Sequence, residues 1–133
     1  MEILYVHDDA EEIALLVEAL HYADRSIKFS YALDIYDALR KLNNYLAIPD
    51  AIFVDYHLGG LDGFECVKQI KAREELKHVP VVMVSAILTP GMIDELNKLG
   101  VYNFLSKDAL HSEMVPMLKV LLECLSRPEK NPS

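Results

Sequence analysis

Cysteine, basic charge and long apolar runs are all scarce in this sequence, and each shortage argues against a class of protein. The two cysteines, Cys66 and Cys124, lie far apart and form no CxxC pair, so we expect small core residues of a reducing cytosol rather than a metal site. Thirteen basic residues against 21 acidic ones give a net charge of −8. Such a surface repels a phosphate backbone, which argues against nucleic-acid binding.

No apolar run approaches the roughly 20 residues that a membrane-spanning helix needs. The longest runs, residues 79–86 and 115–122, are interrupted or far too short. Met1 is followed at once by Glu2 and a strand-like segment, so no signal sequence is expected. We therefore expect a cytoplasmic protein that does not bind membranes.

What the chain does contain is enough apolar sequence for one core. Its 133 residues are 52% hydrophobic and 26% charged, and a chain of this size buries roughly 65–70% of its unfolded surface without a disulfide or structural metal. We expect one domain over residues 1–126. The polar, proline-bearing residues 127–133 are expected to form a tail or a linker stub.

Strand-like and helix-like segments alternate along the chain. Strands are predicted over residues 3–6, 27–33, 51–54, 79–84 and 101–105. Helices are predicted from residue 10, behind a cap at Asp34, after Gly63, from the Thr89 cap to Gly100, and over residues 110–125. Pro116 lies in the last of these, so that helix is expected to begin near the proline or to kink there. Five such units predict a doubly wound α/β fold, with a parallel sheet covered by helices on both faces.

Polar side chains follow four of the predicted strands. In chain order they are His7, Asp8, Asp9, Asp55, Ser85 and Lys107. Because the carboxyl ends of parallel strands meet at one edge, these groups are expected to converge in the ligand crevice. The acidic residues there would repel each other unless a divalent cation is bound, and oxygen ligands favour Mg²⁺. The alternative for each aspartate taken alone is a helix cap.

With a cation present, the Asp55 carboxylate can attack a phosphoryl group. Lys107 and Mg²⁺ would neutralise the charge of that group from two sides, and Ser85 would hydrogen-bond a third oxygen. The acidic excess supports this prediction, because residues 1–66 hold 13 acids and 4 bases. The sequence therefore predicts a phosphoryl-accepting site at this edge of the sheet.

This constellation resembles the receiver domain of two-component response regulators, from Glu2 to about Leu125. The resemblance is carried by the acids after the first strand, the loop of residues 55–63, the pair Ser85-Ala86, Phe104 and Lys107. It implies a flavodoxin-like (βα)5 three-layer sandwich whose parallel five-stranded sheet has the order 2-1-3-4-5.

The resemblance also implies a role for each residue. Asp55 would be the phosphoacceptor, Lys107 the phosphoryl-pairing lysine, Ser85 the switch hydroxyl and Phe104 the switch aromatic. Ala86 would leave room for the incoming phosphohistidine. The Mg²⁺ ligands would be Asp8, Asp55 and the backbone carbonyl of His57, with Asp9 as a ligand if the acidic pair is shifted by one residue.

The implied partners are a histidine kinase or histidine phosphotransfer protein as donor, and a downstream protein target. The target would bind the face built by the fourth helix, fifth strand and fifth helix, and a homodimer is possible. The chain would not be an enzyme beyond catalysing its own phosphorylation and dephosphorylation. In the family, the residues two positions after the phosphoacceptor and two positions after the switch hydroxyl tune the access of water to the phosphoryl group. Here they are His57 and Ile87. Ile87 cannot orient a water molecule, so slow hydrolysis of the phosphoryl group is predicted.

Three positions depart from the family pattern. His7 stands where the first acid is expected, unless Asp8 and Asp9 form the pair. Gly59 replaces a common proline, and Asp108 replaces a common cis proline after the lysine. A cis bond before a non-proline residue costs about 3 kcal/mol, so the Lys107-Asp108 bond is either trans in a re-routed loop or strained.

Other functions stay open at the level of sequence. His7 and Asp108 suggest a phosphorylation-independent pseudo-receiver that serves as a docking or dimerisation module. His7 and His57 could form a transition-metal site with Asp8 and Asp55, although no ligand spacing requires it. A flavodoxin-like carrier needs a glycine- and hydroxyl-rich loop after the first strand, and an aspartate-nucleophile phosphatase needs its nucleophile there. This chain has acids in place of that loop and no DxD nucleophile motif after its first strand, and its presumed nucleophile, Asp55, follows the third strand.

Overall fold

The structure, a computed structural model, describes residues 1–43, 48–57, 62–107 and 111–126. These residues form five strands and five helices in alternation. In chain order they are β1 (Glu2–Val6), α1 (Ala10–Ala23), β2 (Lys28–Ala32), α2 (Ile35–Leu42), β3 (Ala51–Asp55), α3 (Gly63–Lys71), β4 (Val81–Ser85), α4 (Pro90–Lys98), β5 (Asn103–Ser106) and α5 (His111–Ser126).

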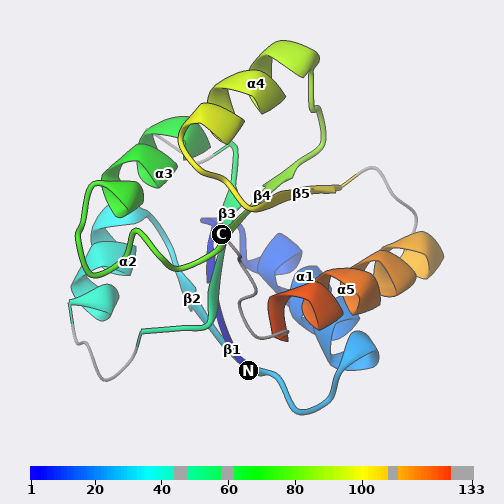
Figure 1. Ribbon diagram of the computed structural model, residues 1–133. Coiled ribbons are helices and arrows are strands. Elements are labelled where there is room, and N and C mark those ends of the chain that lie inside the picture. The colour runs from blue at the N-terminus through cyan, green and yellow to red at the C-terminus, as the bar shows by residue number, and fades with distance from the viewer. Residues whose placement is uncertain (44–47, 58–61, 108–110, 127–133) are drawn as a thin grey trace.

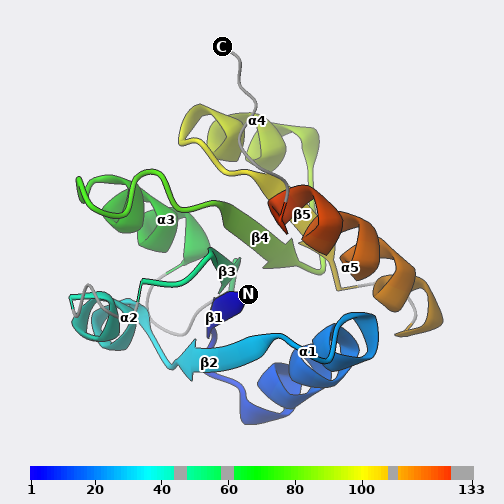
Figure 2. The same cartoon turned by 60° about the horizontal axis from the view of Figure 1, so that its bottom comes forward.

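The strands form one parallel sheet of order β2-β1-β3-β4-β5, which confirms the predicted fold. Figures 1 and 2 show α1 and α5 side by side on one face, and α2, α3 and α4 on the other. The strand order reverses between β1 and β3, because the chain moves outward to β2 and then back across the sheet. A crevice between the carboxyl ends of these two strands follows from that reversal.

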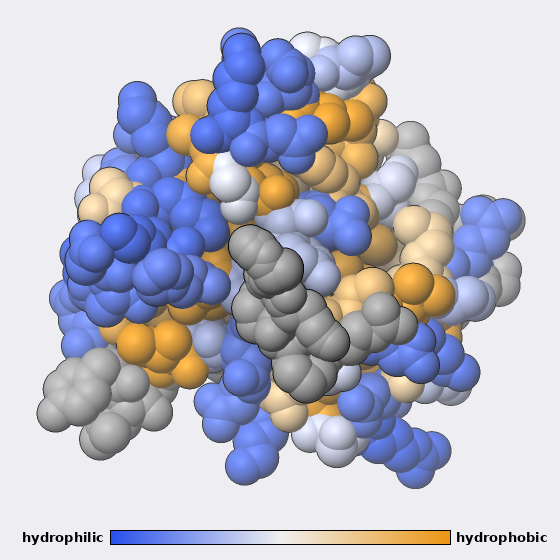
Figure 3. All heavy atoms as spheres, viewed as in Figure 1, coloured by the Kyte–Doolittle hydropathy of each residue, from blue (hydrophilic) through white to orange (hydrophobic). Residues whose placement is uncertain are grey.

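Two apolar layers hold the helices to the sheet. One packs α1 and α5 against side chains such as Phe53 and Leu105, and the other packs α2, α3 and α4 against side chains such as Val54 and Met83. All five residues of β3 and of β4 are buried, as expected for central strands covered on both sides. On the face viewed in Figure 3, hydrophilic atoms gather over α3 and α4.

Side-chain caps fix where the helices begin. Asp34 accepts a hydrogen bond from Asp37 N, and Thr89 accepts one from Met92 N, which confirms both predicted caps. Gly100 adopts a φ of 93° just after α4, a backbone conformation that favours glycine and ends the helix as predicted. Cys66 is a buried free thiol whose pKa is raised by burial to about 12.

Several predicted strand boundaries differ from the structure, three of them where local hydrogen bonds compete with the sheet. The strand expected over 79–84 begins at Val81, since Val79 N bonds to Leu76 O and the next residue is a proline. The strand expected over 101–105 begins at Asn103, since Val101 N bonds to Leu96 O. The strand expected over 27–33 ends at Ala32, since Leu33 N bonds to the Asp37 side chain.

Of the two alternatives predicted for the last helix, a start near Pro116 was wrong, and a kink at the proline stays a prediction. Helix α5 starts at His111 and contains the proline. Pro116 has no N–H to donate to the carbonyl of residue 112. It lies near the N-terminus of α5, where the helical hydrogen bonds are only beginning, so few of them are disturbed. Of the described helices, none is long and apolar enough to span a bilayer. The predicted tail, 127–133, lies outside the described residues.

Gly63, the first residue of α3, lies in close contact with the backbone at the end of β3. Its amide donates to Tyr56 O at 2.6 Å, and a Cβ there would lie 2.6 Å from Tyr56 Cα and 2.7 Å from Asp55 O. These neighbours are backbone atoms, so they cannot turn aside as a side chain would.

We predict that Gly63→Ala lowers the free energy of unfolding by about 1–3 kcal/mol, as overpacking does. The matched control is Gly91→Ala in α4, where an added Cβ meets nothing within 4 Å; it should leave stability unchanged or raise it by up to about 1 kcal/mol. Urea unfolding followed by circular dichroism measures both. Equal effects at the two glycines would contradict the role assigned to Gly63.

Candidate functional site

The carboxyl ends of the strands deliver the polar side chains to one edge, as the sequence predicts. Asp55 and Ser85 are the last residues of β3 and β4, and both are fully buried. Strand register pairs Asp55 with Val84 and Ser85 with Ser106, so the ends are level. Lys107 follows β5, where its amide donates to Ser85 O at 2.9 Å.

The Asp55 carboxylate is held from two sides. Its Oδ1 accepts a hydrogen bond of 2.8 Å from His57 N, which orients the group. Its Oδ2 contacts the Lys107 ammonium, and lies 3.4 Å from Tyr5 Oη and 3.5 Å from His7 Nε2. A buried carboxylate is costly unless it is paired and hydrogen-bonded, and this one has both kinds of partner.

The Lys107 ammonium is shared between two carboxylates, because it also pairs with Glu12. Burial acts to lower the pKa of Lys107, but hydrogen bonds and charge attraction from Asp55 and Glu12 raise it more, and the net shift is upward. The amine is therefore firmly protonated. It supplies a fixed positive charge beside the Asp55 carboxylate.

Glu12 reaches the site from the first turn of α1, and the sequence analysis did not select it. The hydrogen bond from Lys107 is the main reason that the pKa of Glu12 is lowered; burial opposes this shift, and His7 adds to it. Helical spacing could have found the residue. Glu12 lies four and eight positions before the buried Leu16 and Leu20, so it faces the sheet.

His7 occupies the inner position after β1, with only 4% of the residue exposed. Its Nε2 lies 3.0 Å from Glu12 Oε1, in hydrogen-bond geometry. Its Nδ1 lies 3.5 Å from Asp8 Oδ1 but lacks hydrogen-bond geometry with it. Among the described side chains, Nδ1 is a buried nitrogen without a hydrogen-bond partner.

The two acids that follow His7 are placed differently from it. Asp9 is the N-cap of α1, and its Oδ1 accepts hydrogen bonds from Glu11 N and Glu12 N at 2.9 and 3.3 Å. For Asp9, the structure therefore shows the helix-capping role that was the alternative to metal binding. The Asp8 side chain is 45% exposed and lies beside the His7 ring.

The remaining predicted residues lie around Ser85. Its hydroxyl donates to Ile87 O at 2.7 Å and accepts from Ile87 N at 3.2 Å. Ala86 is half-buried and Ile87 is 61% exposed. Phe104 is half-buried and packs against the apolar layer under α2, α3 and α4. Gly59 and Asp108, and with it the Lys107-Asp108 bond, lie outside the described residues.

A divalent cation fits the donor atoms at this edge. One ligand atom each from His7, Glu12 and Asp55 lie within 4.8 Å of one another. Two of these donors are carboxylates, which are suitable ligands for Mg²⁺ or Mn²⁺, and the third is an imidazole nitrogen. The set therefore differs from the predicted oxygen-only set of Asp8, Asp55 and the His57 carbonyl.

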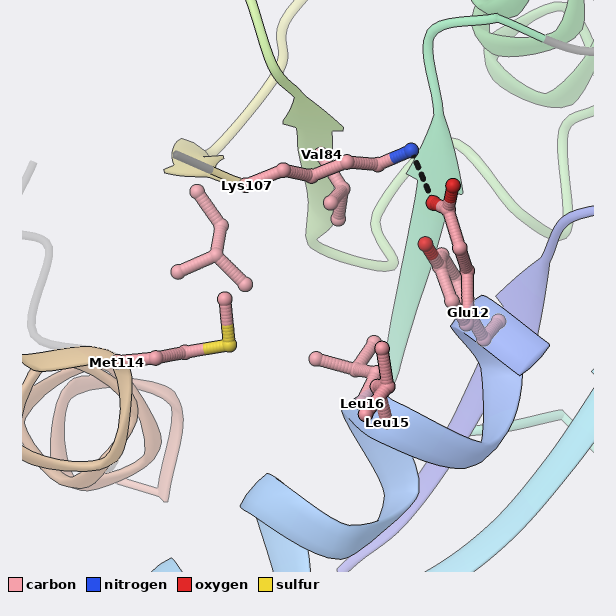
Figure 4. A pocket seen from close by; sticks show the side chains of 8 residues that line it. Glu12, Leu15, Leu16, Val84, Lys107 and Met114 are labelled. Carbon is pink, nitrogen blue, oxygen red and sulfur yellow. Dashed lines mark hydrogen bonds and ion pairs between the residues drawn. The ribbon is translucent and has the colours of Figure 1, made fainter. Parts of the chain in front are cut away.

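An apolar pocket of about 270 Å³ lies next to the ion pair. Figure 4 shows Lys107 and Glu12 meeting at one end, and Leu15, Leu16 and Met114 below them. The pocket lies between α1 and the start of α5. Its apolar walls reduce the water around Lys107 and so strengthen the ion pairs there.

The sequence of residues 3–119 matches the family model of the response regulator receiver domain. The polar-differentiation response regulator DivK of Brucella ovis is 29% identical over 107 residues, which cover 80% of this chain and 81% of DivK. The sensory/regulatory protein RpfC of Xanthomonas campestris pv. campestris is 32% identical over 71 residues. That match covers 52% of this chain but 10% of RpfC, so the chain corresponds to a small part of that relative.

A solved structure gives the same result for the fold. The phosphorylated cyanobacterial phytochrome response regulator RcpA superposes with a TM-score of 0.81 at 28% sequence identity. The superposition covers 99% of this chain and 98% of RcpA. The similarity therefore extends over all five strand–helix units rather than over the sheet alone.

The contacts of Glu12 predict how stability depends on pH. Because the pKa of Glu12 is lowered in the folded state, its contribution is fully present above the ordinary carboxyl pKa and is lost as pH falls through the lowered value. We predict that wild type melts at a higher temperature than Glu12→Gln at pH 7, and that this difference shrinks toward pH 3.

Glu11→Gln is the matched control, because Glu11 is the exposed neighbour of Glu12. Thermal unfolding by circular dichroism across this pH range measures all three proteins. A difference between wild type and Glu12→Gln that stays constant with pH would contradict the ion pair with Lys107.

Proposed function

Because the chain belongs to the response regulator receiver domain family, we propose that it accepts a phosphoryl group on Asp55. The donor is a histidine kinase or a histidine phosphotransfer protein, and phosphorylation changes affinity for a downstream protein partner. The observation that carries the proposal is the buried Asp55 carboxylate, oriented by His57 N and neutralised by Lys107. An aspartate used merely as a helix cap would need neither contact.

In the proposed reaction, a carboxylate oxygen of Asp55 attacks the phosphorus atom of a phosphohistidine. The bond from oxygen to phosphorus forms as the bond from phosphorus to the imidazole nitrogen breaks, and the imidazole leaves with the bonding electron pair. Lys107 stabilises the charge on the phosphoryl oxygens, as fixed cations do in phosphoryl transfer. Ala86, half-buried next to Ser85, leaves room for the donor.

A divalent cation bound at this edge would supply a second positive charge for the phosphoryl oxygens. The predicted Mg²⁺ ligands Asp8, Asp9, Asp55 and the His57 carbonyl stay a prediction. Asp55 and Glu12 present carboxylate oxygens toward the same space as Lys107, which supports cation binding there.

We further propose that Ser85 and Phe104 transmit the phosphorylated state. The Ser85 hydroxyl is satisfied by the backbone of Ile87, and it would exchange this partner for a phosphoryl oxygen. Phe104, which is half-buried on β5, would then shift. Such a two-state element, biased by a local charge, is a general switching device.

The proposed target surface is the face of α4, β5 and α5. Exposed apolar side chains in these segments are Met117 and Val120 on α5, with exposed fractions of 41% and 61%, and Tyr102 just before β5, with 45%. Exposed apolar side chains of this kind can contribute to a protein-binding surface.

The first test is phosphorylation from acetyl phosphate. Incubation of wild type with acetyl phosphate and Mg²⁺ should add one phosphoryl group by intact mass, and Asp55→Asn should take up none. The matched control Asp62→Asn should behave as wild type, because Asp62 is an exposed cap of α3 that asparagine can replace. Absence of uptake in wild type, or uptake by Asp55→Asn, would overturn the proposal in favour of a phosphorylation-independent docking module.

The second test is the lifetime of the phosphorylated state. Ile87 is 61% exposed and has no group that can orient an attacking water molecule. We predict slow phosphoryl loss in wild type and a severalfold faster loss in Ile87→Asn, measured by intact mass after removal of acetyl phosphate. Ile87→Val should match wild type, and equal rates in all three proteins would contradict a role for this position.

A further inference from the structure

We propose that His7, Glu12 and Asp55 form a mixed nitrogen and oxygen site that binds a divalent first-row transition-metal ion in preference to Mg²⁺. The ligands would be His7 Nε2 and the carboxylates of Glu12 and Asp55. This site deepens the proposed function, because Asp55 would be both a metal ligand and the phosphoacceptor. The consequence for signalling given below rests on the proposed function. The physical basis of the site is the placement of three donors from β1, α1 and β3 within 4.8 Å.

The donor set itself selects the class of metal. Mg²⁺ prefers oxygen ligands in near-ideal octahedral geometry, whereas imidazole suits first-row transition-metal ions. His7 Nε2 lies 3.0 Å from Glu12 Oε1 and 3.5 Å from Asp55 Oδ2. His7 Nε2 thus lies near both carboxylates. A metal site with oxygen ligands only would need an oxygen atom at this position.

The other nitrogen of His7 provides independent support. Nδ1 is buried and without a hydrogen-bond partner among the described residues, although Asp8 Oδ1 lies 3.5 Å away. If Nε2 binds a cation, the imidazole proton must be on Nδ1, where it can point toward the Asp8 carboxylate. Metal-binding histidines commonly donate their second N–H to a carboxylate in this way. Asp8 would then position His7 rather than bind the cation directly.

Formal charges also favour a divalent ion. Asp8, Glu12 and Asp55 bring three carboxylates to the His7 ring, and Lys107 brings one ammonium. The excess of two negative charges matches one divalent cation. The Lys107 ammonium contacts the same Glu12 and Asp55 oxygens that the cation would use, so the two compete.

This competition has a consequence for signalling. A bound cation would displace the Lys107 ammonium from Glu12. The freed ammonium could then pair with a phosphoryl group on Asp55. Glu12 would therefore have two alternative partners, Lys107 in the cation-free protein and the metal ion in the loaded one.

The test is a Mn²⁺ titration of the full chain, with free Mn²⁺ measured by its electron paramagnetic resonance signal. Glu12→Gln should weaken Mn²⁺ binding at least tenfold, whereas the neighbouring Glu11→Gln should stay within twofold of wild type. Lys107→Met should bind Mn²⁺ more tightly, because the competing charge is gone. Mg²⁺ should displace Mn²⁺ from wild type only at more than tenfold higher concentration.

Pulsed spectra identify the nitrogen ligand directly. Mn²⁺ bound to wild type should show nitrogen modulation, and His7→Asp should abolish it. The same substitution should let Mg²⁺ displace Mn²⁺ at a lower concentration than in wild type. Circular dichroism checks that each variant folds. If His7→Asp fails to fold, Glu12→Gln still tests the site, because it changes a partly exposed side chain. Absence of nitrogen modulation in wild type, or equal effects of Glu12→Gln and Glu11→Gln, would overturn the inference.

The two proposals can fail separately. Phosphoryl uptake on Asp55 without nitrogen modulation would leave the proposed function standing and remove the mixed site. Mn²⁺ binding that depends on His7 and Glu12, in a chain that takes up no phosphoryl group, would do the reverse.

Discussion

The arrangement of this edge depends on one buried negative charge. Asp55 is fully buried at the end of a central strand, where an unpaired carboxylate would cost several kcal/mol. The loop amide of His57 and the ammonium of Lys107 offset that cost from opposite sides. Lys107 follows β5, two strands away from β3 in the sheet, so this pairing forms only when β3, β4 and β5 are assembled.

The same pairing prepares the site for chemistry. A carboxylate in contact with a fixed cation is suited to receiving an anionic group, because the same cation can stabilise the added negative charge. Glu12 adds a second carboxylate to Lys107, and His7 links both acids. The edge thus holds more negative charge than Lys107 alone can balance, and this imbalance favours binding of a divalent cation.

Much of this could be predicted from the sequence, because short-range patterns decide it. Apolar periodicity predicted the alternating elements, and the caps at Asp34 and Thr89 follow from residue type alone. Glu12 was missed because its contact with Lys107 joins residues 95 positions apart and depends on which face α1 turns to the sheet. The strand starts were missed because the Val79 amide bonds to Leu76 O and the Val101 amide bonds to Leu96 O in α4, and such competition is decided by three-dimensional geometry.

A double-mutant cycle between Glu12 and Lys107 tests the central claim, that one ammonium is shared by two carboxylates, most directly. The free energy of unfolding is measured for wild type, Glu12→Gln, Lys107→Met and the double variant at neutral pH. The account predicts a favourable coupling energy of about 0.5–3 kcal/mol, the range found for residues in one ionic network. Strictly additive effects of the two substitutions would contradict it.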